Sequence, residues 1–337
     1  MAPKKLFITG TTGYIGGAVL GEILKRHGQA LSITALLRSP SREYSEEYPT
    51  VNVVKGSFDD FDVISKAASE ADIVIHAGDI DHEGCAKAIL DGVAKRSERC
   101  FVIHLSGTGC ISDKLEQTWE GKYNPHQWHD IAEIKEIYDL PPEAAHHTID
   151  QWFMDADNDI VKTAIICPPD IYGEGTGIGN RATFLVPRYV EALLEHKEAF
   201  YLGEGNNIRA VTHIDDVVNL FILILEKAIE GGSGADWGRE GFYFAVSDSV
   251  RWRDAAEAIA ALGRKQGFLP RDAKAVSWTK DQVAALLPDA PGLVLYLWGS
   301  NSRGESARAR KIGWKPAGPS FWESLDEDCR VAHAKAK

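Results

Sequence analysis

Three glycines near the start of the chain have the spacing of a site for a negatively charged group. Gly10, Gly13 and Gly16 follow an apolar run at residues 6–8 and precede a helical pattern that continues to about residue 27. In a strand–turn–helix unit the first glycine permits a sharp turn, the second a close approach to a phosphate, and the third tight helix packing. The free N–H groups at the helix start then face the anion. The spacing is GxxGxxG, one residue longer in its first gap than the GxGxxG dinucleotide fingerprint.

Arg38 stands 22 residues after Gly16, at the end of the second expected strand. That position faces the adenosine ribose in dinucleotide-binding folds. An acidic residue there would accept hydrogen bonds from the ribose hydroxyls and select NAD, whereas an arginine offers a fork of donors to a 2′-phosphate. Arg38 therefore favours NADP (NADPH) over NAD, against the alternative of a solvated arginine at a strand end.

Five short apolar runs within the first 105 residues alternate with helical patterns. The expected strands are residues 6–9, 31–37, 51–54, 72–76 and 101–105. This alternation predicts a Rossmann-like doubly wound α/β fold, in which a parallel sheet is covered by helices on both faces. Right-handed crossovers place the carboxyl ends of the strands at one edge, where ligands bind.

Small and aromatic residues follow the third and fourth strands at this edge. The carboxyl end of the fourth strand, His76-Ala77-Gly78-Asp79, should lie beside the cofactor phosphates and ribose, and Ala77 and Gly78 are small enough to permit close approach. Phe58 and Asp59 could border the adenine, the first by stacking and the second by accepting from the amino group. The alternative for this pair is the start of a helix.

The chain is long enough for a nucleotide-binding domain and a second, smaller unit. Residues 1–170 are assigned to the NAD(P)-binding domain, to which residues 209–213, 215–230 and 241–246 return; residues 171–208 and 247–337 form a small carboxyl-terminal substrate-binding lobe. A helix is expected at 143–157. The segment 107–140 is too long for an ordinary connection and is rich in Trp, Tyr and His, as in functional or mobile loops.

Composition excludes several classes of partner. The net charge of −12, from 37 basic and 49 acidic residues, disfavours nucleic acids and anionic membranes. The amino terminus lacks a signal-peptide pattern, and the longest apolar helix candidate, residues 217–225, is too short to span a bilayer. Five scattered cysteines without CxxC spacing indicate reduced thiols, so a cytoplasmic protein is expected. No spacing of His and Cys predicts a metal site, and no GxSxG turn predicts a serine nucleophile.

Six stretches together carry a resemblance to a known family. They are TGTTGYIG at 9–16, DIVIHAG at 72–78, HLSGTG at 104–109, PPDIYGEG at 168–175, RAVTHIDDVV at 209–218 and ARKIGWKP at 309–316. In these residues the chain resembles the extended short-chain dehydrogenases/reductases, in the neighbourhood of dihydroflavonol reductases and NAD-dependent epimerases/dehydratases. The resemblance covers nearly the whole chain but does not specify a substrate.

The resemblance implies a distribution of binding roles. The pyrophosphate and ribose would be held by Gly10, Thr12, Gly13, Tyr14, Ile15 and Gly16, and the nicotinamide would lie near Pro168, Pro169 and Ile171. Homodimers are common in the family, so the resemblance also allows a homodimer. In the family's chemistry a Ser or Thr after the fifth strand orients the carbonyl, and Ser106 fits that role, with Thr108 as a nearby substitute.

The family's Tyr and its Lys four residues later are missing from this chain. The Lys is needed because a phenol with a pKa near 10 is a poor base until a cation stabilises its anion. Counting back from Cys167-Pro168, the Tyr position falls near Pro141 or Pro142, and the Lys position near His146 or His147. A shifted register places His147 at the Tyr position and Gln151 at the Lys position.

Three replacements for the missing pair remain open. His146 or His147 could serve as the acid, since imidazole titrates near neutral pH. Tyr123 or Tyr138 could be supplied by the segment 110–142, or substrate or water could carry the proton. Each residue also has a plainer interpretation, as an exposed helix start for the His pair and as aromatic packing for Tyr123.

The sequence therefore predicts an NADP(H)-dependent oxidoreductase with a non-standard proton donor. The expected substrate is a small, aromatic or alicyclic carbonyl or alcohol, with Ser106 polarising its oxygen and His147 and Tyr123 as further catalytic candidates. Two alternatives keep the fold. The first is a non-redox isomerase, cyclase or lyase with NADP as a structural cofactor, and the second is a binding protein that senses NADP(H).

Overall fold

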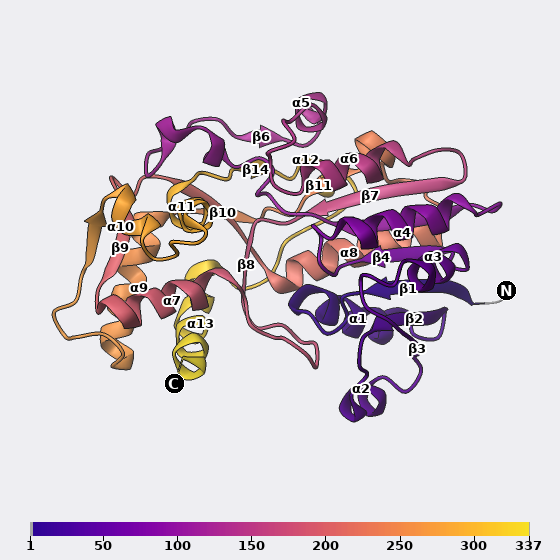
Figure 1. Cartoon of the computed structure of the whole chain (residues 1–337), viewed down its shortest axis with the longest axis horizontal. Coiled ribbons are helices and arrows are strands. Elements are labelled where there is room, and N and C mark those ends of the chain that lie inside the picture. The colour runs from indigo at the N-terminus through magenta and orange to yellow at the C-terminus, as the bar shows by residue number, and fades with distance from the viewer. Residues whose placement is uncertain (1–2, 337) are drawn as a thin grey trace.

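A parallel sheet of seven strands forms the centre of the larger part of the molecule (Figure 1). The computed structural model describes residues 3–336. The strands are β1 (Lys4–Thr9), β2 (Leu31–Leu37), β3 (Asn52–Lys55), β4 (Ile73–His76), β5 (Cys100–Leu105), β7 (Val161–Cys167) and β11 (Phe242–Phe244). Their order across the sheet is β3-β2-β1-β4-β5-β7-β11. The expected Rossmann-like doubly wound fold is confirmed.

Helices cover both faces of this sheet. One face packs against α1 (Tyr14–His27) and α8 (Ile214–Ile229), and the other against α3 (Phe61–Ser69), α4 (Glu83–Ala94) and α6 (His147–Asp155). Side chains of β1 alternate between the two cores, with Leu6 and Ile8 in the first and Phe7 in the second. Because both faces are buried, the central strands are apolar almost throughout.

The remaining elements near the sheet are short. Helix α2 (Arg42–Glu47) follows β2, and α5 (Ile134–Tyr138) precedes α6. Single 3₁₀ turns lie at Asp113–Leu115, Gln117–Trp119 and Gly238–Glu240. Within the described residues no helix is long and apolar enough to cross a membrane.

A lobe with its own apolar core lies at the end of the molecule far from the amino terminus (Figure 1). Its elements are α7 (Leu185–His196), α9 (Trp252–Gln266), α10 (Lys280–Ala284), α11 (Pro291–Gly299), α13 (Phe321–Lys335) and the parallel pair β9 (Ala199–Leu202) and β13 (Ala275–Trp278). Trp252, Tyr189 and Phe200 are fully buried at its centre.

Two small sheets and one helix join the lobe to the larger part. Strand β10 (Ile208–His213) pairs with β8 (Asp170–Tyr172) and β12 (Asp248–Arg251) rather than with the seven-stranded sheet. Strand β6 (Trp128–His129) pairs with β14 (Gly304–Glu305). After α12 (Ala307–Lys311) the chain runs back, and Ala309 and Trp314 lie in the same core as α1 and α8.

Helix α6 is shorter than the helix expected at 143–157. It begins at His147, because Pro141 and Pro142 open a series of turns and His146 adopts a left-handed conformation with φ of 67°. Ala156 closes the helix by donating its N–H to Trp152. The spacing of apolar residues correctly predicted a helix. The residue at which the helix begins depends on the backbone conformation of His146, which the spacing does not predict.

Candidate functional site

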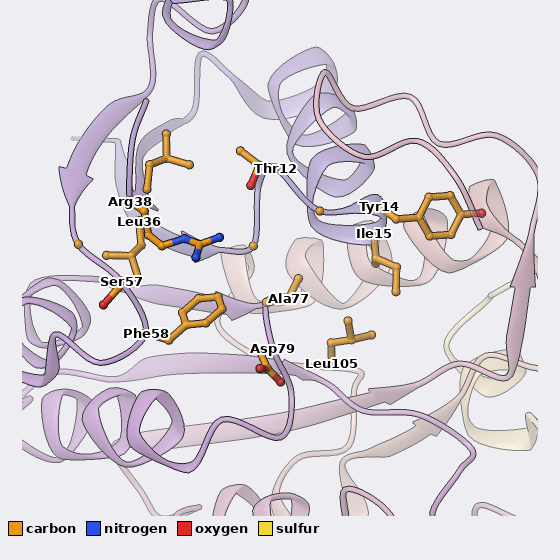
Figure 2. A pocket seen from close by; sticks show the side chains of 15 residues that line it. Thr12, Tyr14, Ile15, Leu36, Arg38, Ser57, Phe58, Ala77, Asp79 and Leu105 are labelled. Atoms are coloured by element: carbon orange, nitrogen blue, oxygen red, sulfur yellow. The ribbon is translucent and has the colours of Figure 1, made fainter. Parts of the chain in front are cut away.

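A cleft of about 340 Å³ opens at the carboxyl edge of the sheet, beyond the ends of β1, β2 and β4 (Figure 2). Nine of the residues predicted to bind cofactor line it: Gly10, Thr12, Gly13, Tyr14, Ile15, Arg38, Phe58, Ala77 and Gly78. Asp79, in the segment 76–79 that the sequence placed beside the cofactor, also lines it. The sequence interpretation did not assign five further lining residues: Leu36, Leu37, Gly56, Ser57 and Leu105. All five stand at or just beyond strand ends, so their position in the chain could have indicated them.

The glycine turn at the floor of the cleft leaves no room for side chains. Gly10 has φ of 80°, and a Cβ there would lie 2.1 Å from the carbonyl oxygen of Ala77. A Cβ on Gly16 would lie 2.3 Å from the carbonyl oxygen of Gly10. Gly16 is buried against the turn and acts from beneath the cleft rather than by lining it.

The start of α1 offers unoccupied donors to the cleft. Its first residue is preceded by Gly13, which has no side chain to cap the helix, and no acidic residue stands in the first turn. The free N–H groups and the positive end of the helix dipole therefore suit a phosphate. Together with the turn, this arrangement fits the pyrophosphate of a dinucleotide.

Arg38 lies at the rim of the cleft and points its guanidinium between the glycine turn and Phe58 (Figure 2). Its side chain is exposed, and within residues 3–336 it forms no hydrogen bond or ion pair. The carboxylate that lines the cleft, Asp79, stands at the end of β4 rather than of β2. The end of β2 thus presents an unpaired cation where a ribose-binding carboxylate would stand.

Phe58 and Asp59 have different surroundings. The ring of Phe58 lies against Gly78, where a Cβ would come within 2.5 Å of it, which explains why that position is glycine. Asp59 is exposed and pairs with Nε2 of His82 at 3.2 Å. The structure therefore places Phe58 in the cleft and Asp59 beside it.

Pro168 and Ile171 lie on the segment from β7 to β8, outside the residues that line the cleft. The carbonyl of Pro168 accepts a hydrogen bond from the N–H of Thr108 at 2.9 Å. The carbonyl of Ile171 accepts from the hydroxyl of Thr183. This segment is thereby fixed against the loop that follows β5.

Of the three catalytic candidates, Ser106 and His147 both lie near Asp150, whereas Tyr123 contacts Arg303. Ser106 is 3% exposed and donates a hydrogen bond of 2.6 Å to Oδ2 of Asp150. His147 is buried, and burial lowers its pKa. Tyr123 is 49% exposed, and its hydroxyl accepts from Arg303 at 3.3 Å.

Two buried histidines stack beneath this edge; the sequence interpretation placed His76 beside the cofactor but did not predict its contact with His104. His76 of β4 and His104 of β5 are partners in register and stack with ring centroids 5.2 Å apart. Nδ1 of His76 lies 2.7 Å from the hydroxyl of Thr9, and Nε2 of His104 lies 3.4 Å from Oδ1 of Asp150. Burial lowers the pKa of His104 to about 3. The sequence signal that could have predicted this stacking is a histidine near the carboxyl end of each of two successive apolar strands.

Comparisons with known proteins match two parts of the chain to nucleotide-binding families. A family model described as NAD(P)H-binding matches residues 10–172, and one described as the NAD dependent epimerase/dehydratase family matches residues 135–237. An oxidase of Acremonium sp, ucsJ, is 28% identical, and the alignment covers 96% of this chain and 96% of that protein.

Solved structures share the fold over the whole chain. UDP-glucose 4-epimerase of Thermotoga maritima has a TM-score of 0.65 at 14% identity, covering 99% of this chain and 100% of that one. dTDP-glucose 4,6-dehydratase of Bacillus anthracis, in complex with NAD, has a TM-score of 0.64 at 15% identity, covering 98% and 97%.

The chain is thus similar to NAD(P)H-binding proteins over residues 10–172 and to NAD-dependent epimerases/dehydratases over residues 135–237. Both matches agree with the resemblance to the extended short-chain dehydrogenases/reductases that the sequence carries.

Proposed function

We propose that the protein is an NADP(H)-dependent oxidoreductase that acts on a small carbonyl or alcohol. The observation that supports the choice of NADP(H) is Arg38, an unpaired guanidinium at the end of β2 that points into the cleft (Figure 2). A guanidinium forms paired, charge-assisted hydrogen bonds with a phosphate, and these are stronger than bonds between neutral groups. The neighbouring Thr12 lines the same part of the cleft.

The chain's own residues would divide the work of binding. The glycine turn and the start of α1 hold the pyrophosphate, Phe58 lies against the adenine, and Arg38 binds the 2′-phosphate. A bound nicotinamide dinucleotide supplies or accepts a hydride at the substrate carbon. The family and the oxidase relative support an enzyme on this fold.

A cytoplasmic location is part of the proposal. All five cysteines are buried and unpaired. Thiols persist in this state where the compartment is reducing.

Isotope transfer tests the redox step. The protein is incubated with NADPH deuterated at C4 and a panel of aromatic and alicyclic ketones and aldehydes, and the products are analysed by mass spectrometry. We expect deuterium in the product. A product without deuterium would support the non-redox isomerase, cyclase or lyase, and tight NADPH binding without any product would support a binding protein. Gly13→Asp, which places a carboxylate in the phosphate site, is the control that should abolish cofactor binding.

A further inference from the structure

His146 lies just beyond the cleft, where the ends of β4 and β5 come together. Its Nδ1 is 2.8 Å from Oδ1 of Asp81, two residues past the cleft residue Asp79. On the other side its Nε2 faces the loop after β5, since a Cβ on Gly107 would lie 3.3 Å from this atom and one on Gly109 3.1 Å. The imidazole thus spans the two strand ends, with Nδ1 held by Asp81 and Nε2 directed at Gly107 and Gly109, which carry no side chains.

The backbone holds His146 in a costly conformation. Its φ of 67° is shared, among non-glycine residues of the described chain, with Lys197 alone. Lys197 is the carboxyl-terminal cap of α7, where this conformation is common. His146 instead precedes α6, where a residue normally has extended geometry. Such a residue costs about 1–3 kcal/mol and is typical of functional sites.

A second polar group reaches the same point from the lobe. A Cβ on Gly109 would lie 3.2 Å from the hydroxyl of Tyr296, on α11. Arg209 and Lys114 lie over the Tyr296 ring, at 4.7 and 5.5 Å from its centroid. The lobe and the nucleotide-binding part therefore both direct polar groups at the loop after β5.

The other candidates for the missing Tyr are already engaged. The hydroxyl of Tyr138 donates to the carboxylate of Asp155, and Arg239 packs on its ring. The side chain of His147 points into the core, and its Nε2 has no partner there. His146 is the member of the pair that is accessible, with 20% of its side chain exposed.

We propose that His146 is the acid–base residue that exchanges a proton with the substrate oxygen, and that Asp81 is the positioning residue that orients its ring. The inference rests on the proposed function. In reduction, the substrate carbon gains a hydride, the carbonyl π electrons move to oxygen, and the oxygen takes the proton from Nε2 of His146. The proton on Nδ1 stays on the ring and forms the hydrogen bond to Asp81. Nε2 takes up a new proton from water. In oxidation each transfer reverses.

Charged and titratable groups surround this ring from every packed element. They are Asp81 after β4, His104 at the end of β5, His147 and Asp150 on α6, Lys114 in the segment after β5 and Tyr296 on α11. The hydrogen bond from His146 holds the pKa of Asp81 below its ordinary value. The carboxylate is therefore charged at neutral pH and favours a proton on Nδ1.

Asn replaces His146 in the test, because asparagine tolerates the left-handed conformation and does not titrate near neutral pH. The matched control is His126→Asn, which removes a histidine held by Glu133 at the same 2.8 Å but on the segment before β6. We expect H146N to lower kcat at least 100-fold, the lower range for general acid catalysis. H126N should stay within twofold of the wild type, and the calorimetric Kd for NADPH should change less than threefold in both.

Two further measurements separate proton transfer from a structural role. D81N should lower kcat about 10-fold without raising KM. In the protein without substrate, the ¹³C titration midpoint of the Asp81 carboxyl should move up in H146N and stay unchanged in H126N.

The outcomes distinguish the two claims. If the wild type reduces a carbonyl and the kcat of H146N is less than threefold lower, the role of His146 is overturned. The oxidoreductase proposal then still stands. A wild type that transfers no deuterium to any carbonyl overturns the proposed function, and this inference with it. An Asp81 midpoint that does not move in H146N overturns the orienting contact. Unchanged thermal unfolding of H146N excludes loss of the fold as the cause of lost turnover.

Discussion

At the scale of single residues, Asp150 links the protonation of a buried group to stability. Its side chain is 1% exposed, and burial raises its pKa to about 7, against the opposing effect of the hydrogen bond from Ser106. Between about pH 4 and pH 7 the folded protein therefore keeps a proton that the unfolded chain has lost. This carboxyl destabilises the fold progressively as pH rises through that window, and the effect is constant above it.

Asp150→Asn should remove this dependence. Across pH 5 to 7, the unfolding free energy of the variant should improve relative to the wild type by up to about 1.4 kcal/mol per pH unit. Urea denaturation at several pH values measures the difference. A difference that stays constant from pH 5 to 8 would show that Asp150 does not hold a proton in the folded state.

Single residues also show which parts of the site were predictable. The glycine turn and Arg38 were found because their chemistry depends on residue type and spacing near one strand–turn–helix unit. Asp150 and the stacked His76 and His104 were not, because they meet through a helix and two strands far apart in the sequence. The sequence interpretation named His147 rather than His146 as a catalytic candidate, and only the backbone geometry before α6 shows which of the two rings is accessible.

At the scale of an element, two of the three glycines in α1, Gly16 and Gly21, have opposite requirements. A Cβ on Gly16 would lie 2.3 Å from the carbonyl oxygen of Gly10, whereas one on Gly21 meets nothing within 4 Å. Gly16→Ala should destabilise the protein by about 1–3 kcal/mol through overpacking and weaken NADPH binding. Gly21→Ala should stabilise it by about 0.5–1 kcal/mol, because alanine restricts the unfolded chain.

Chemical denaturation of the two variants, with NADPH titrations beside it, measures both effects. Equal stability of the two would contradict the close packing of α1 on the turn. The strand–turn–helix unit itself was predictable, since its apolar periodicity and its glycines are local. No strand was predicted in the segment 107–140, because the pairing partner of β6 is β14, and Gly304 of β14 stands 176 positions after its partner Trp128.

At the scale of the whole molecule, the last part of the chain completes the core of the nucleotide-binding part. Trp314 is 1% exposed, and its indole N–H donates to the carbonyl of Asp216 on α8 at 2.8 Å. The carboxylate of Asp216 in turn accepts from the N–H groups of Ala317 and Gly318. This packing of residues 309–318 on α8 was not predicted. The sequence interpretation assigned all of 247–337 to the lobe because these residues follow one another in the chain, whereas Trp314 is buried against α8.

Trp314→Ala should therefore lower the free energy of unfolding far more than the loss of an exposed side chain from the surface of the lobe. The expected cost is about 3–5 kcal/mol, the range for a buried Trp. Trp322→Ala is the control, because this residue is 46% exposed, and it should cost less than half as much. Equal unfolding free energies of the two variants would mean that the carboxyl-terminal return is not part of the core.

The central claim is that the cleft holds NADP(H) through Arg38, and calorimetric titration with NADPH and NADH tests it most directly. We predict that the wild type binds NADPH at least 10-fold more tightly than NADH. Arg38→Ala should weaken NADPH binding about 10- to 100-fold, the loss of about 1.5–3 kcal/mol for hydrogen bonds to a charged group, and leave NADH binding unchanged. Equal or tighter binding of NADH by the wild type would contradict the claim.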